Sequence, residues 1–134
     1  MIHSVCRPIA ADRSEVLALL QDPGRWACWL DGVDVVAEPT GVRLEVGGPR
    51  PFAVFLSVQS CDGGVAFELV EGEISGLDGR VVLEVREGVE MVCWEQELQV
   101  PIPLPPPLAR EIEDEVIGRW LARLDQVARG ERDG

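Results

Sequence analysis

The sequence predicts an α+β protein in which an antiparallel sheet of six or seven strands packs against one long C-terminal helix. Apolar and polar residues alternate from Val33 to Val100, as in strands with one buried face. Apolar residues then recur at helical spacing from Leu108 to Arg129. Five prolines lie between these regions, within residues 101–107. Because proline cannot donate a backbone hydrogen bond to a sheet, this run is expected to end the last strand.

Length and composition fit one domain over residues 1–130, followed by a flexible tail at 131–134. The chain has 134 residues, 46% of them hydrophobic, which suffices for a single core. No apolar run reaches the roughly 18–20 residues that cross a bilayer. The N-terminus lacks the basic start and long apolar stretch of a secretory signal. We therefore expect a cytoplasmic protein without stable membrane insertion.

The chain is strongly acidic, with a formal net charge of −12 and arginine at all 12 basic positions. Nucleic-acid binding needs clusters of basic side chains to neutralise phosphates, and the sequence has none. DNA and RNA are therefore excluded as expected partners, and an anionic membrane surface is disfavoured for the same reason. A small uncharged or weakly charged ligand stays open, and the sequence identifies no protein partner.

Four cysteines, Cys6, Cys28, Cys61 and Cys93, lie far apart, without a close pair. Zinc sites usually show closely spaced ligands, often with histidine, and the one histidine is His3. We therefore expect no metal and no other cofactor. The cysteines are interpreted as small buried apolar residues or free thiols.

Two short helices are expected after a first extended segment at residues 1–10. Asp12 begins the first helix in a capping box, in which its carboxylate accepts from the backbone while Glu15 reaches back. Asp22 caps the second helix, which carries two tryptophans and ends at Gly32.

The strands that follow are joined by hairpin signals at residues 39–41, 62–64 and 87–88, each containing glycine. The glycine-containing segment 72–79 suggests a bulge or a loose start of the sixth strand, with a separate turn at 78–79 as the alternative. After the last strand, the prolines are expected to form a stiff polyproline spacer of roughly 20 Å that positions the terminal helix. A PxxP ligand for an SH3-like module is the alternative reading of this run.

The inward face of each strand follows from where its charges lie. In the last strand, Trp94, Gln96 and Leu98 must face the core, because Glu95 and Glu97 occupy the other face. The same reasoning turns inward Phe67, Leu69, Val81, Leu83 and Val85. The strand around Leu56 is apolar on both faces, so its orientation stays open. On the terminal helix, the face opposite the apolar one is expected to carry Arg110, Glu113, Asp114 and Arg123.

Three stretches of the sequence resemble the helix-grip superfamily, also called SRPBCC. They are "RPIAADRSEVLALLQDPGRWACWLDGV", "FELVEGEISGLDGRVVLEV" and "PLAREIEDEVIGRWLARLDQVA". The superfamily includes START lipid-transfer domains, polyketide cyclases and dehydrases, and coenzyme-Q-binding proteins. The resemblance implies a curved sheet that wraps around the C-terminal helix and leaves an apolar cavity. It also implies a small hydrophobic ligand: a lipid, an isoprenoid or a polyketide-like molecule.

The cavity implied by this resemblance has a definite set of candidate wall residues. They are Trp26, Trp29, Leu56, Phe67, Leu69, Leu83, Trp94, Gln96, Leu98, Ile117, Trp120 and Leu121. Gln96 either orients a carbonyl or hydroxyl of a ligand or is a core amide satisfied by the protein itself. The tryptophans either cap the mouth or simply pack the helices to the sheet. A core filled by these large side chains is the alternative to a cavity.

No catalytic residue is predicted, because the sequence lacks a nucleophile motif, a phosphate loop and tyrosine. The strand glutamates are expected to face solvent, and Arg7 and Arg43 reach the interior only if their strands are turned over. Two alternatives to ligand binding follow from the resemblance. One is a cyclase or dehydrase activity, and the other is protein interaction of the ribosome-association-toxin type.

Overall fold

The computed structural model describes residues 3–47, 51–72, 76–99 and 106–130. The elements follow one another as β1 (His3–Pro8), α1 (Arg13–Leu20), η1 (Pro23–Cys28, a 3-10 helix), β2 (Val33–Glu38), β3 (Gly41–Val46), β4 (Phe52–Cys61), β5 (Gly64–Gly72), β6 (Gly76–Arg86), β7 (Val89–Gln99) and α2 (Pro106–Ala128). This order confirms the expected succession of a strand, two short helices, a run of strands and a long terminal helix.

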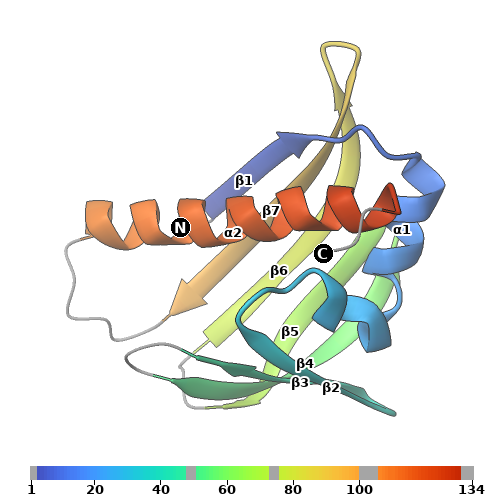
Figure 1. The fold of residues 1–134 in the computed structure, drawn as a ribbon. Coiled ribbons are helices and arrows are strands. Elements are labelled where there is room, and N and C mark those ends of the chain that lie inside the picture. The colour runs from blue at the N-terminus through green and yellow to red at the C-terminus, as the bar shows by residue number, and fades with distance from the viewer. Residues whose placement is uncertain (1–2, 48–50, 73–75, 100–105, 131–134) are drawn as a thin grey trace.

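All seven strands form one antiparallel sheet in the order β1-β7-β6-β5-β4-β3-β2. Each of β2 to β6 pairs with the next strand along the chain, and β1 closes the sheet against β7. The sheet curves, and α2 lies across its concave face, with α1 and η1 at one end (Figure 1). The predicted α+β class, the antiparallel sheet and its curvature around the terminal helix are therefore confirmed.

The starts of the two short helices differ in how they are capped. Asp22 accepts a hydrogen bond from the backbone N–H of Gly24 at 3.2 Å, as predicted for the second helix. The capping box predicted at Asp12 is wrong, because its side chain makes no capping hydrogen bond. The backbone carbonyl of Asp12 accepts from Glu15 and Val16 instead, which satisfies those amides without the carboxylate.

The hairpin signals are confirmed, and the alternative of a separate turn at residues 78–79 is wrong, because both residues lie within β6. Residues 73–75, where a loose start of the sixth strand would fall, lie outside the described residues. Gly79 lies inside β6, directly opposite Phe67 of β5, and the register shift in the sheet falls between Phe55 and Leu56. A Cβ at position 79 would collide with the backbone carbonyl oxygen of Glu95 in β7 and would lie 2.7 Å from Cζ of Phe67. The glycine is therefore needed for the close approach of the β7 backbone and of the Phe67 ring, at a position where β6 keeps its register with both neighbouring strands.

The expected polyproline spacer lies largely outside the described residues. The helix α2 begins at Pro106, so the last two prolines of the run belong to its first turn. Proline suits this position, because the first amides of a helix have no intrahelical acceptor to donate to.

The predicted inward face of the strands is the one that contacts the core, with one exception. Val81, Leu83, Phe67 and Trp94 are buried, and burial of Leu56 resolves the orientation of β4. The prediction for Val85 is wrong, since its side chain is 61% exposed. Val85 pairs with Glu90 near the tip of the β6–β7 hairpin, which projects beyond α2 (Figure 1).

The edge strand β1 and the segment after it hold α2 in place through polar contacts. Arg7 donates to the backbone carbonyl of Gly118 at 3.0 Å. The buried carboxylate of Asp125 accepts from the backbone N–H groups of Ala10 and Ala11 at 3.0 and 2.9 Å. Asp125 was not predicted from the sequence, although an acidic residue on the apolar face of a helix indicates a buried carboxylate with hydrogen-bond donors around it.

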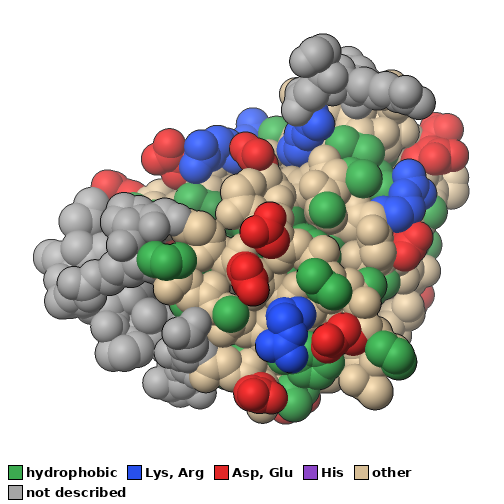
Figure 2. Space-filling model, turned by 60° about the horizontal axis from the view of Figure 1, so that its bottom comes forward, with side chains coloured by type: hydrophobic (Ala, Val, Ile, Leu, Met, Phe, Trp, Pro, Cys, Tyr) green, Lys and Arg blue, Asp and Glu red, His purple; other side chains and the backbone are tan. Residues whose placement is uncertain are grey.

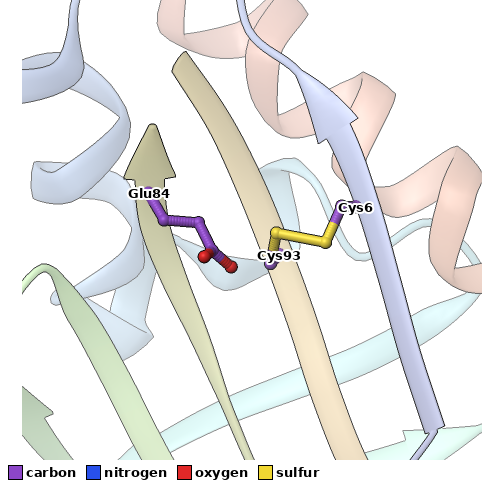
Figure 3. Close-up of side chains that lie close together, drawn as sticks. All are labelled: Cys6, Glu84 and Cys93. Carbon is purple, nitrogen blue, oxygen red and sulfur yellow. A yellow bond between two sulfur atoms is a disulfide. The ribbon is translucent and has the colours of Figure 1, made fainter. Parts of the chain in front are cut away.

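A disulfide between Cys6 and Cys93 corrects the interpretation of the cysteines. The two residues are 87 positions apart, but β1 pairs with β7 in a register that sets them directly opposite each other. The bond therefore joins the edge strand to its neighbour on the convex face of the sheet, with Glu84 beside it (Figure 3). Cys28 and Cys61 are free thiols, as expected.

Truncation of Leu124 to alanine is expected to lower the free energy of unfolding by about 2–5 kcal/mol. The side chain is 0% exposed and packs in the core between α2 and the sheet. Urea unfolding followed by circular dichroism measures the change. The exposed Val70 of β5 is the control, because Val70→Ala should shift stability by no more than about 0.5 kcal/mol. Equal stabilities of Leu124→Ala and the wild type would show that α2 is not packed as described.

Candidate functional site

An apolar cavity of about 250 Å³ lies between the concave face of the sheet, α2 and η1. A cavity needs only about 10–15 Å³ to hold one water molecule, so this one has room for an organic molecule. Its walls combine residues of the helical segments with residues of six strands. The helical and turn residues are Trp26, Trp29, Leu30, Ile112, Glu113, Val116, Ile117 and Trp120. The strand residues are Val33, Leu44, Val46, Phe52, Val54, Leu56, Phe67, Leu77, Val81, Trp94 and Gln96.

All four tryptophans of the chain line this cavity and contact one another in series. The ring centroids of Trp29 lie 6.2 Å from those of both Trp26 and Trp94, in edge-on arrangements. Trp94 in turn lies 5.5 Å from both Phe67 and Trp120. Such tilted and edge-on pairs are favourable arrangements of aromatic rings, so the cluster forms a stable wall.

The indole N–H groups of these tryptophans have different partners. Trp26 donates to the carbonyl of Leu20 and Trp120 to the carbonyl of Asp31, both at 2.9 Å. These two bonds tie η1 and α2 to neighbouring turns, which favours the packing role of the tryptophans over that of a free lid. Trp29 differs, because its buried Nε1 has no hydrogen-bond partner within the described structure.

Two polar side chains in the lining form a hydrogen-bonded chain with Trp94. The indole N–H of Trp94 donates to Oε1 of Gln96 at 2.8 Å. Nε2 of Gln96 in turn donates to Oε2 of Glu113, across 3.5 Å. The protein itself therefore satisfies the Gln96 carbonyl, which favours the second interpretation of this residue.

The position of Glu113 corrects the prediction of which residues lie on the polar face of the terminal helix. The sequence puts it opposite the apolar face, but the structure brings it into the cavity lining beside Ile112 and Val116. The aliphatic part of a glutamate side chain can cover apolar surface while its carboxylate reaches a partner, here Gln96. Of the lining residues, Glu113 is the one with an ionisable side chain.

Eight of the twelve candidate wall residues lie in the cavity lining: Trp26, Trp29, Leu56, Phe67, Trp94, Gln96, Ile117 and Trp120. Leu83 and Leu121 are buried in the core, and Leu69 packs against it, but none of these three is in the lining. The side chain of Leu98 is outside the described part of the chain. A role of these residues in ligand binding stays a prediction.

The main residues that the candidate set missed come from β2, β3 and β4. Val33, Leu44, Val46 and Val54 line the cavity. Strand alternation carries the signal for them, because the charged residues Arg43 and Glu45 flank Leu44 and fix the inward face of β3. Arg43 instead contacts the Phe55 ring, with its guanidinium carbon 5.4 Å from the ring centroid.

Charged groups elsewhere in the described chain lie away from the cavity. Arg80 pairs with Glu95 on the outward face of the sheet, and His3 lies 2.6 Å from the exposed Asp114. Cys6, Glu84 and Cys93 are close enough to share a metal ion, but the two sulfurs are bonded to each other and are not thiolate ligands (Figure 3). None of these groups is in the lining of the cavity.

The charge of the surface concerns the expectation for nucleic acid, and the composition of the helices concerns the expectation for membranes. On the face shown in Figure 2, arginine side chains stand apart from one another among acidic and apolar ones. Exclusion of nucleic acid stays a prediction from charge. Of the helices that the structure describes, none combines the length and apolar character needed to span a membrane.

No protein-family model and no curated protein matches the sequence, whereas solved structures match almost the whole chain. A START superfamily protein from Mycobacterium smegmatis has a TM-score of 0.78 and 14% identity, over 96% of this chain and 97% of that one. A major latex-like protein from Panax ginseng has a TM-score of 0.66 and 11% identity, over 96% and 97%. A STAR-related lipid transfer protein from Xanthomonas axonopodis reaches 0.64 and 16%, over 92% and 83%. The chain has the helix-grip fold.

The predicted resemblance to the helix-grip superfamily is thus confirmed at the level of the fold. At identities of 11–16%, the likeness carries no residue of these proteins over to this chain. The cavity between sheet and helix is the feature of this helix-grip domain on which a functional argument can rest.

Proposed function

We propose that this helix-grip domain binds one small, predominantly apolar molecule in the cavity between the sheet and α2. The observation that carries the proposal is the cavity itself, about 250 Å³ of space walled almost entirely by aliphatic and aromatic side chains. Walls that face empty space lose dispersion contacts, and an apolar ligand restores them. A ligand of this kind also loses its own unfavourable contact with water.

Binding is favoured over chemistry by the composition of the lining. Proton transfer usually needs an acid and a base in reach of the reacting atoms. Within the lining as described, Glu113 is the one ionisable group. The cyclase or dehydrase alternative and the protein-interaction alternative stay predictions from the resemblance, as does the identity of the ligand as a lipid, isoprenoid or polyketide-like molecule.

The expected location also stays a prediction. Disulfides persist mainly in oxidising compartments and are rare in the cytoplasm. The Cys6–Cys93 bond therefore argues against the cytoplasmic location that the N-terminus suggested.

Titration with the neutral apolar dye phenylnaphthylamine tests the proposal. We expect saturable binding at one site, with a change in tryptophan emission, because all four tryptophans line the cavity. Filling the cavity with Val116→Phe should weaken binding by at least about tenfold, since the larger side chain competes for the ligand's space. Val116 is half-buried on α2, so a larger side chain there disturbs the core less than one on a strand.

The matched control is Val70→Phe, the same change at a position 60% exposed and outside the lining. It should bind the dye as the wild type does. Absence of saturable binding to the wild type, or equal weakening in both variants, would contradict the proposed function.

A further inference from the structure

The convex face of the sheet carries a compact group of three side chains whose donor atoms suit a metal ion (Figure 3). Cys6 of β1, Glu84 of β6 and Cys93 of β7 each offer one ligand atom, and these atoms lie within 4.8 Å of one another. In the oxidised chain the two sulfurs are bonded to each other. Reduction converts them into two separate ligands beside the carboxylate.

The backbone keeps the two cysteines together whether or not the disulfide is present. Strand β1 pairs with β7 over its whole length, in a register that sets Cys6 directly opposite Cys93. Strand β6, which carries Glu84, pairs with the other side of β7 over its whole length. Cβ atoms of opposite residues on paired strands lie about 4.5–5.5 Å apart. The two sulfurs of the reduced form therefore stay within reach of one ion.

The three donors match the preferences of zinc and similar thiophilic divalent cations. Thiolate sulfur and carboxylate oxygen are both common zinc ligands, at about 2.3 Å and 2.0–2.2 Å. A tetrahedral ion with these bond lengths holds its donors about 3.5–3.8 Å apart, which the observed group allows, since its atoms lie within 4.8 Å. Calcium and magnesium prefer oxygen ligands alone. The donor set therefore selects a thiophilic ion, with a fourth position for water.

Burial and charge at this position favour a cation. Cys93 is fully buried, and Cys6 and Glu84 are half-buried, so water screens their charges weakly. Two thiolates and a carboxylate repel one another, and a divalent cation offsets that repulsion. Arg86 donates to Oε1 of Glu84 at 3.1 Å and helps to hold the carboxylate in place. The Arg86 side chain is itself 51% exposed, so its own charge is well screened.

We propose that the reduced chain binds one Zn²⁺ or similar thiophilic divalent cation between Cys6, Cys93 and Glu84. The ion then replaces the disulfide as the link between β1 and β7. The same position thus holds a disulfide in an oxidising compartment and a metal in a reducing one. The site is independent of the apolar cavity, because none of its three residues is in the lining.

The change from disulfide to metal site balances with a dithiol as the reductant. The dithiol supplies two electrons and two protons, and its own sulfurs become a disulfide. The bond between the sulfurs of Cys6 and Cys93 breaks, and each sulfur becomes a thiol. The cation displaces the two thiol protons, which pass to solvent, and keeps its own oxidation state.

Titration of the reduced chain with Cd²⁺ tests the site, because cadmium–thiolate bonds give an ultraviolet absorption band. The double variant Cys28→Ser, Cys61→Ser is the background, so that the two free cysteines contribute no thiolate. It is reduced with a water-soluble phosphine, freed of excess reductant and titrated without oxygen. We expect the band to saturate at one ion per chain and Zn²⁺ to compete for the same site. The oxidised chain should show no band.

Three further substitutions in this background separate the ligands from their surroundings. Cys6→Ser should remove at least half of the band, because one thiolate is lost. Glu84→Gln should weaken binding of both ions at least about tenfold, since an amide oxygen carries no charge. Glu68→Gln is the matched control, because it makes the same change at an exposed position of β5 outside the group. The control should bind as the background does.

Urea unfolding of the reduced background shows whether the ion binds the folded chain. An ion that binds only the folded arrangement stabilises it, so Zn²⁺ should raise the unfolding midpoint. Absence of the cadmium–thiolate band after reduction would overturn the proposal. Equal affinities of Glu84→Gln and Glu68→Gln, or a midpoint that Zn²⁺ leaves unchanged, would also overturn it. None of these results affects the proposed binding of an apolar molecule in the cavity.

Discussion

Reduction of the Cys6–Cys93 disulfide is expected to lower the free energy of unfolding by about 4–5 kcal/mol. The bond spans a sequence separation of 87 residues, and closing a loop of that length removes much conformational entropy from the unfolded chain. The loss should be visible in urea unfolding of the wild type with and without dithiothreitol, followed by circular dichroism.

The location of the disulfide predicts which elements respond first. Strand β1 holds α2 through the bond from Arg7 to Gly118 and, just beyond its end, through Asp125. Reduction should therefore speed amide hydrogen exchange in β1 before it affects β4 and β5. A double Cys6→Ala, Cys93→Ala variant should behave like the reduced wild type and show no response to dithiothreitol.

The exposed, free Cys28 provides the control. Cys28→Ser should have the stability of the wild type and the same sensitivity to dithiothreitol. Identical unfolding midpoints of the oxidised and reduced wild type would show that the bond contributes no stability.

The fold could be predicted from the sequence because its signals are local. Alternation in β6 and β7, glycine at the hairpin turns and the apolar spacing of α2 each depend on neighbouring residues. The disulfide depends instead on which strands become neighbours. The register of β1 against β7 joins residues from opposite ends of the chain. The spacing of the cysteines along the sequence therefore does not indicate the disulfide.

The cavity walls could be predicted in part, for a similar reason. Strand parity places Phe67 and Trp94 inward, and both lie in the lining. Parity cannot tell how far along a strand the helix reaches, so Leu83 is equally inward but belongs to the filled core. The hydrophobic pattern of α2 also placed Glu113 on the wrong face of the helix. Its side chain hydrogen-bonds with Gln96 of β7, and the pattern of one helix does not show a partner on the sheet.

Replacement of Trp29 by alanine is expected to lower the free energy of unfolding by about 3–5 kcal/mol. The side chain is 1% exposed, is the largest of the fully buried ones, and contacts the rings of Trp26 and Trp94. Its removal would enlarge the cavity and leave both neighbouring rings without their edge-on partner. Urea unfolding in the absence of added ligand measures the loss.

Replacement of the same residue by phenylalanine should change stability by no more than about 1 kcal/mol, since two effects oppose each other. The smaller ring loses some packing, but the substitution also removes a buried N–H group that has no partner among the described residues. Trp26→Phe is the matched control, because its indole donates to the carbonyl of Leu20. That variant loses a hydrogen bond and should cost about 1–3 kcal/mol more than Trp29→Phe. If the two phenylalanine variants are equally destabilised, the Trp29 N–H has a partner in solution, and the cavity wall is more polar than described.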